Sequence, residues 1–231
     1  MTDQSVEAIK SQNLASTQSA LFLAGYFVLA VLLPSWIDQL GSYAMYIAEA
    51  LFVVWVLYVF RENYSGRYRM WTAPDRFVWL GLCLGFGSGF GIHFLAQKLD
   101  LGVPFDFSCH ETWVLLLLVG PLLEEALFRQ ALWFLLEVFV KKKTPSTQVE
   151  VTQSNLNWPL IFISAALFSG AHFYSFFFVP AGFSTFVLFQ TAYTFLLGVG
   201  LSVAFSRTRA FWVPWALHTT FNLGFALAIL I

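Results

Sequence analysis

Two adjacent glutamates and an arginine stand in a stretch of the chain that is otherwise apolar. Glu124, Glu125 and Arg129 fall within the run 112–140, whose length and composition predict a helix across a bilayer. An ionised side chain near the bilayer centre costs at least about 2.5 kcal/mol. A helix therefore seldom holds three charges unless they pair or perform a function, and these residues are the first candidates for chemistry.

The spacing of these charges separates the two glutamates. Glu125 and Arg129 are related as i and i+4, so they face each other along one helix and can neutralise each other. Glu124 lies about 100° around the same helix and points elsewhere. A carboxylate in a low-dielectric site binds a proton more readily than one in water, which suits a general base. The simpler interpretation is a structural ion pair with a spare glutamate lining a polar cavity.

Two further apolar stretches hold single polar groups. His172 lies in the stretch 158–179, and His218 and Asn222 lie in the stretch 211–231. The last two residues share a helix face, and an imidazole beside an amide can donate two hydrogen bonds to one oxygen, as an oxyanion site requires. Hydrogen bonding between helices is the alternative for His172 and for this pair.

Depth along the expected helices tests whether these groups can meet. At a rise of 1.5 Å per residue, Glu124 lies roughly 18 Å from the outer end of its helix. His172 lies roughly 21 Å from the inner end of its own helix, and His218 and Asn222 lie roughly 10–17 Å from the inner end of theirs. All fall in the middle zone of an apolar layer about 30 Å thick, so convergence is allowed by depth.

Three motifs in this order resemble those of a known protease family. Glu-Glu-x-x-x-Arg, Phe-x-x-x-His and His-x-x-x-Asn occupy the span from Glu124 to Asn222. They are similar to the motifs of the CPBP family, the CAAX-protease and bacteriocin-processing intramembrane endopeptidases also called Abi proteins. One departure is Gln130, where many bacterial members have glycine, and it affects close packing at that position.

The resemblance implies a role for each matching residue. Glu124 would activate water as the base, with His172 helping to hold or polarise it. His218 and Asn222 would stabilise the oxyanion, and Glu125 with Arg129 would support the first motif.

No cofactor or metal is predicted. Two histidines and a glutamate are ligand types that zinc accepts, but Glu124 cannot easily be both a ligand and the base. The chain has no His-Glu-x-x-His motif, and the resemblance implies a glutamic-type mechanism. Glu49 and His93, which stand alone in other apolar stretches, are expected to form interhelical hydrogen bonds rather than line a cavity.

Composition defines the class of protein. Of the 231 residues, 58% are hydrophobic and 11% are charged, against about 25% charged in soluble domains. This predicts an all-α polytopic membrane bundle. A polar segment 1–18 precedes one membrane domain, 19–231, whose motif core lies at about 112–231. A net charge of −1 without a basic tail argues against nucleic acid.

About seven membrane-spanning helices are expected, separated by polar breaks at 61–76, 98–111 and 141–157. A short break at 180–182 predicts a tight antiparallel hairpin. The expected helices are 19–37, 42–60, 77–97, 112–140, 158–179, 183–205 and 211–231.

The basic residues predict the orientation. With seven spans, Lys98 lies alone on one side of the membrane and Arg129 lies within it. The other basic residues all lie on the second side. Cytoplasmic loops carry the excess of Lys and Arg, so the N-terminus is expected in the cytoplasm and the C-terminus outside. A bacterial cytoplasmic membrane is the expected location. The cytoplasmic set is Lys10, Arg61, Arg67, Arg69, Arg76, Lys141, Lys142, Lys143, Arg207 and Arg209.

The sequence therefore predicts an intramembrane endopeptidase that uses Glu124 to activate water. Its partners would be the bilayer and a membrane-associated protein or peptide, such as a prenylated tail, a leader peptide or a C-terminal sorting signal. A proton-coupled transporter or channel is an alternative, but it should have polar residues spread over more helices. A non-catalytic immunity-type membrane protein is a third, and it has no chemical reason to retain all three motifs.

Overall fold

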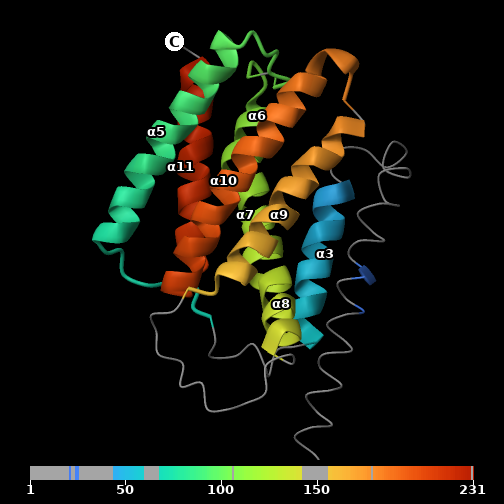
Figure 1. Cartoon of the computed structure of the whole chain (residues 1–231), viewed down its shortest axis with the longest axis vertical. Coiled ribbons are helices and arrows are strands. Elements are labelled where there is room, and N and C mark those ends of the chain that lie inside the picture. Colours follow the sequence, from blue (N-terminus) through green and yellow to red (C-terminus); the bar gives the residue numbers. More distant parts are fainter. Residues whose placement is uncertain are drawn as a thin grey trace, which may run out of the picture.

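The chain folds into a bundle of long helices (Figure 1). The computed structural model describes residues 21, 24–25, 44–59, 68–105, 107–141, 156–177, 179–229 and 231. Within these residues the structure is helical and contains no strand, and an isolated bridge pairs Arg69 with Ala210. The predicted all-α class is therefore confirmed.

The helices follow the predicted segments closely. The expected helix 19–37 falls almost wholly outside the described residues, and the expected 158–179 ends early, at Tyr174. Two helical stretches, Arg76–Lys98 and Ala181–Thr208, are long and apolar enough to cross a bilayer. The elements are α3 (Ala44–Val59), α5 (Arg76–Lys98), α6 (His110–Val114), η1 (Leu115–Val119), α7 (Gly120–Glu125), η2 (Ala126–Ala131), α8 (Leu132–Lys141), α9 (Trp158–Tyr174), η3 (Ser175–Phe177), η4 (Ala181–Phe183), α10 (Ser184–Thr208) and α11 (Trp212–Ile229).

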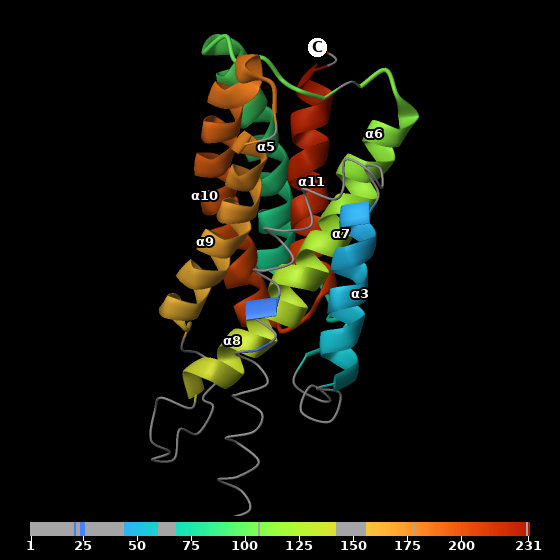
Figure 2. The same ribbon diagram turned by 90° about the vertical axis from the view of Figure 1, so that its right-hand side faces the viewer.

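The elements from α6 to α8 form one continuous helical path across the bundle (Figure 2). Two of them, η1 and η2, are π-helical, so α7 with its two glutamates is held between two widened turns. Such turns are rare and occur frequently at functional sites. From the sequence we expected one regular helix over 112–140 and did not predict these turns.

Successive helices run in alternating directions, and this sorts the charges between the two ends of the bundle. The start of α5, the end of α8 and the turn between α10 and α11 lie at one end, and the end of α5 lies at the other (Figures 1 and 2). Lys98 therefore stands apart from Arg76, Arg207 and Arg209, as the sequence predicted.

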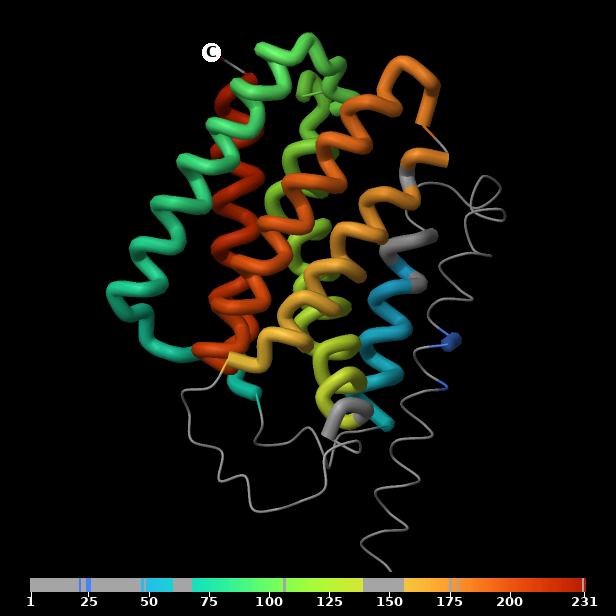
Figure 3. The backbone as a smooth tube through the Cα atoms, in the orientation of Figure 1, coloured from blue at the N-terminus to red at the C-terminus, as the bar shows by residue number. Residues whose placement is uncertain are grey.

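The predicted hairpin is confirmed. Helices α9 and α10 lie side by side and antiparallel, joined by the short turns η3 and η4 (Figure 3). Gly198 of α10 allows this close approach, since a Cβ there would lie 3.1 Å from Cα of Ala165. The hairpin brings the α9 motif against the rest of the site.

A buried carboxylate ties together the end of the bundle where α8 terminates. Glu137 accepts hydrogen bonds from the Tyr68 hydroxyl at 2.7 Å and from Nε1 of Trp133 at 3.2 Å. Nη1 of Arg209 lies 2.6 Å from the same carboxylate. Because three donors surround it, Glu137 can stay buried as an anion, and it links α8 to the turn that starts α11.

Helix α11 packs against α5 through direct backbone contact. A Cβ on Gly89 of α5 would lie 1.9 Å from the carbonyl oxygen of Phe221, and one on Gly224 of α11 would lie 2.1 Å from that of Phe86. Small residues allow helices to approach closely in a membrane, where apolar burial alone gives no preference for protein over lipid. These glycines fix the position of α11, which carries the third motif.

We expect Gly89→Ala to lower the melting temperature in detergent, although alanine favours an isolated helix over glycine by about 1 kcal/mol. The new methyl group would meet the Phe221 carbonyl and push α11 away. Gly87→Ala is the matched control, because nothing lies within 4 Å of a Cβ at Gly87. Equal melting temperatures for the two variants would contradict the backbone contact.

Candidate active site

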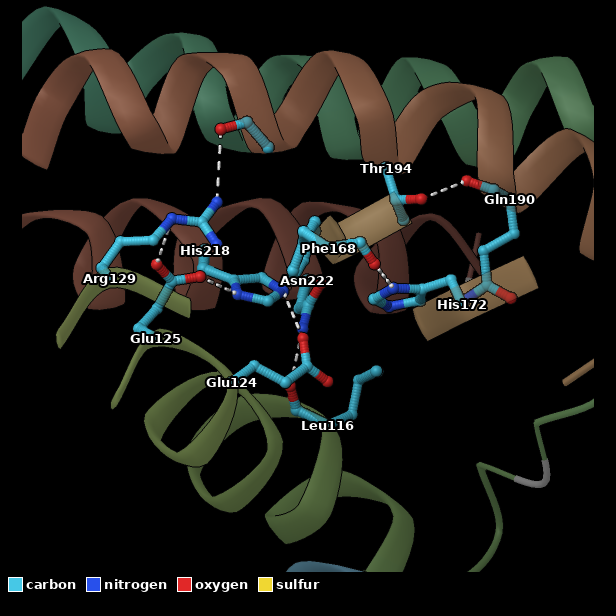
Figure 4. Close-up of polar contacts among 11 residues, drawn as sticks. Leu116, Glu124, Glu125, Arg129, Phe168, His172, Gln190, Thr194, His218 and Asn222 are labelled. Atoms are coloured by element: carbon cyan, nitrogen blue, oxygen red, sulfur yellow. Dashed lines mark hydrogen bonds and ion pairs between the residues drawn. The ribbon is translucent and has the colours of Figure 1, made fainter. Parts of the chain in front are cut away.

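The predicted site residues converge around one cavity. Glu124 of α7, His172 of α9, and His218 and Asn222 of α11 all line a cavity of about 380 Å³. Figure 4 shows their side chains pointing toward one another from these separate helices. The four residues therefore converge, as their expected depths along the helices allowed.

Glu125 lies outside this cavity and is fully paired. It is 0% exposed, with Oε2 3.2 Å from Nε of Arg129 and Oε1 3.0 Å from Nδ1 of His218. Arg129, also 0% exposed, donates through Nη2 to the carbonyl of Gly198 at 3.2 Å and lies over the ring of Phe168. The i,i+4 pair predicted from sequence is present, and His218 joins it from another helix.

Glu124 has a different environment from its neighbour. Its side chain is 26% exposed and faces the cavity, and Nε2 of His218 is 3.8 Å from Oε2. Among the described residues, the buried oxygen Oε2 of Glu124 has no hydrogen-bond partner. The exposed part of the side chain borders the cavity, where a water molecule or a substrate can reach the carboxylate.

His218 connects the two glutamates through its two ring nitrogens. A carboxylate can only accept, so Nδ1–H donates to Glu125 and the tautomer of the neutral ring is set. Nε2 then carries a lone pair in the neutral ring and a proton in the imidazolium. It faces Glu124 and the cavity, so His218 can act there as an acceptor or, when charged, as a donor.

A backbone carbonyl orients His172. Its Nδ1 lies 3.0 Å from the carbonyl oxygen of Phe168, one turn earlier on α9. Since the carbonyl only accepts, Nδ1 carries the hydrogen and Nε2 carries the lone pair. On the wall of the cavity, such a ring can accept a hydrogen bond from water.

Asn222 donates through Nδ2 to the carbonyl of Leu116 at 2.8 Å. This bond joins α11 to η1 and uses one of the two amide N–H groups. From the sequence we expected His218 and Asn222 to donate to one oxygen, and we predicted neither of their protein partners. The groups that remain for a ligand are the second Asn222 N–H and Nε2 of His218.

Two residues outside the motifs differ from expectation. Glu49 of α3 lines the same cavity as Glu124, whereas we expected it to bond between helices. His93 is buried edge-on to Phe225 at 5.0 Å, and its ring nitrogens have no hydrogen-bond partner among the described residues. The two isolated polar residues therefore have different environments, one beside the cavity and one against an aromatic ring.

Within the described residues, no group of three or more His, Cys, Asp and Glu side chains could hold a metal ion.

Comparison with protein families finds a match over half of the chain. The family model for "Type II CAAX prenyl endopeptidase Rce1-like" covers residues 109–224, which include all seven residues of the three motifs. Comparison with curated proteins gives no match, and comparison with solved structures gives none.

We expect Arg129→Ala to impair folding more than Glu124→Gln does. Removing Arg129 leaves the buried Glu125 carboxylate with only its bond to His218, and breaking a buried pair from one side costs about 3–5 kcal/mol. Glu124 is partly exposed to the cavity, so the fold should tolerate the amide that Glu124→Gln introduces. Thermal unfolding of the purified variants in detergent measures this. Equal melting temperatures would show that the buried pair does not support the fold.

Proposed function

Because the chain belongs to the type II CAAX prenyl endopeptidase Rce1-like family, we propose that it cleaves a membrane-associated peptide with water activated by Glu124. The resemblance inferred from the three motifs is thereby confirmed. The family is one of membrane-embedded proteases, so the chain is a peptide hydrolase and not a transporter.

The contrast between the two adjacent glutamates carries this proposal. Glu125 is buried against Arg129 and His218, whereas Glu124 is 26% exposed and lines the cavity. A general base needs a lone pair within reach of the proton that it removes. Glu124 meets this requirement and Glu125 does not.

The steps of hydrolysis follow from the groups around the cavity. Glu124 takes a proton from a water molecule that Nε2 of His172 helps to hold, and the oxygen attacks the carbonyl carbon of the scissile bond. The second N–H of Asn222 and Nε2–H of His218 stabilise the oxyanion. The C–N bond then breaks, and Glu124 passes its proton to the leaving amine.

Charge balance supports the donor role of His218. Glu124 and Glu125 bring two negative charges, and Arg129 brings one positive charge. A proton on Nε2 of His218 would make the charges of Glu124, Glu125, Arg129 and His218 sum to zero. The same proton would supply an N–H that faces the cavity.

The substrate class follows from the family at a coarse level. A membrane-associated peptide fits, and a prenylated tail, a leader peptide and a C-terminal sorting signal all remain candidates. Comparing the termini of membrane proteins in cells carrying wild type or Glu124→Ala would reveal tails cut only by wild type.

We further propose seven spans in a bacterial cytoplasmic membrane, with the N-terminus in the cytoplasm and the C-terminus outside. The basic groups Arg76, Arg207 and Arg209 at one end of the bundle, with Lys98 at the other, support this orientation. No cofactor is proposed.

Glu124→Gln keeps the shape of the side chain but removes the base, so we expect background turnover of a prenylated CAAX peptide with substrate binding retained. Asn222→Ala should leave residual activity, since losing one oxyanion donor lowers kcat by about 100- to 1000-fold. Bound metal is measured in the same preparations. Full activity in Glu124→Gln would contradict the proposed role of Glu124 as the base. Stoichiometric zinc, lost in His172→Ala and His218→Ala, would replace it with a metal-dependent one.

Cysteine labelling tests the orientation, with Cys83→Ala as the background. We expect an impermeant maleimide added to intact cells to reach the native Cys109. A cysteine introduced by Ser146→Cys, in a chain that also carries Cys109→Ser, should be protected because three lysines hold its loop in the cytoplasm. Labelling of both positions to the same extent would mean that the orientation is wrong.

A further inference from the structure

The carbonyl of Leu116 has lost its usual partner within the helix. Its oxygen would accept from residue 120 in an α-helix or from residue 121 in a π-turn. The N–H of Gly120 donates instead to Leu115, and Pro121 has no N–H. Asn222 of α11 donates to this carbonyl at 2.8 Å.

Gly120 and Pro121 together explain the widened turn. A proline ring inside a helix clashes with the carbonyl four residues earlier, here that of Leu117, and widening the turn relieves the clash. A Cβ on Gly120 would lie 2.8 Å from the carbonyl oxygen of Leu115 and 3.9 Å from Oε1 of Glu124. A side chain at position 120 would therefore disturb both the turn and the base.

We infer that Pro121 is a positioning residue that acts through Asn222. By removing one N–H from the helix, it frees the Leu116 carbonyl to hold the Asn222 amide. One amide N–H is then fixed on Leu116, so the plane of the group is fixed and the second N–H is presented to the cavity. This role rests on the proposed function of Asn222 as an oxyanion donor.

The geometry also couples the donor to the base. Glu124 lies on α7, the helix that begins at Gly120, and Asn222 is bonded to the turn just before it. One widened turn thus sets the position of the carboxylate and of the amide across the same cavity. A regular α-helix would satisfy Leu116 internally and leave Asn222 without its acceptor.

A thermal-unfolding cycle tests the contact without any substrate. In the wild-type background Asn222→Ala leaves the Leu116 carbonyl without its hydrogen-bond donor, so the Tm should fall. Pro121→Ala restores an N–H at that position, so in this background the fall caused by Asn222→Ala should be at least halved. Pro121→Ser restores the same N–H and replaces Pro121→Ala if the latter does not fold. Pro214→Ala, at a buried proline of α11, is the control and should leave the fall unchanged.

A kinetic cycle with a farnesylated CAAX peptide tests the positioning role. We expect Pro121→Ala to lower kcat by roughly 10- to 100-fold with KM unchanged, as misplacement of a catalytic group does. The double variant with Asn222→Ala should be no slower than Asn222→Ala alone, whereas Pro214→Ala should leave kcat unchanged.

The outcomes separate this inference from the proposed function. Additive effects of Pro121→Ala and Asn222→Ala on Tm would overturn the Leu116 contact, whatever the activity. Coupled Tm values with additive effects on kcat would overturn the positioning role alone. A wild-type protein that cleaves no peptide would count against the proposed function, and the Tm cycle would still decide whether Pro121 frees the carbonyl.

Discussion

The buried charge of Glu125 is the constraint on which the rest of the structure depends. A carboxylate with no access to water must be compensated in place, and here Arg129 and His218 do so from two helices. Arg129 in turn needs the Gly198 carbonyl of α10 and the Phe168 ring of α9. One charge therefore brings α7, η2, α9, α10 and α11 to a common point, and that point borders the cavity.

Ion pairs and hydrogen bonds alone would not set the distances between the helices. Small residues at the helix contacts set them. In lipid, apolar side chains gain little by leaving their solvent for a protein neighbour. Backbone contact at Gly89 and Gly224 holds α11 against α5, and Gly198 brings α10 close enough for its carbonyl to reach Arg129. The site is thus positioned by glycines that carry no chemistry.

Spacing within one helix was readable from the sequence, and contacts between helices were not. The i,i+4 rule predicted the pair of Glu125 with Arg129, and hydropathy predicted six of the helices; the seventh, 19–37, lies almost wholly outside the described residues. The bond from His218 to Glu125 and the acceptor of Asn222 depend on which helices are neighbours, which no periodicity specifies. Two signals were overlooked: glycines every four residues at 81, 85 and 89, and a proline inside an apolar helix.

The order of the charges explains how two identical neighbours acquire different roles. Arg129 is one helical turn from Glu125 but is displaced around the helix from Glu124, so a single cation neutralises the second glutamate and leaves the first to the cavity. The side chain of Glu124 is 26% exposed and borders the cavity, whereas that of Glu125 is fully buried. In our mechanism the attacking water therefore reaches Glu124 and not Glu125, so one arginine placed a single helical turn from the second glutamate decides which of the two can act as the base.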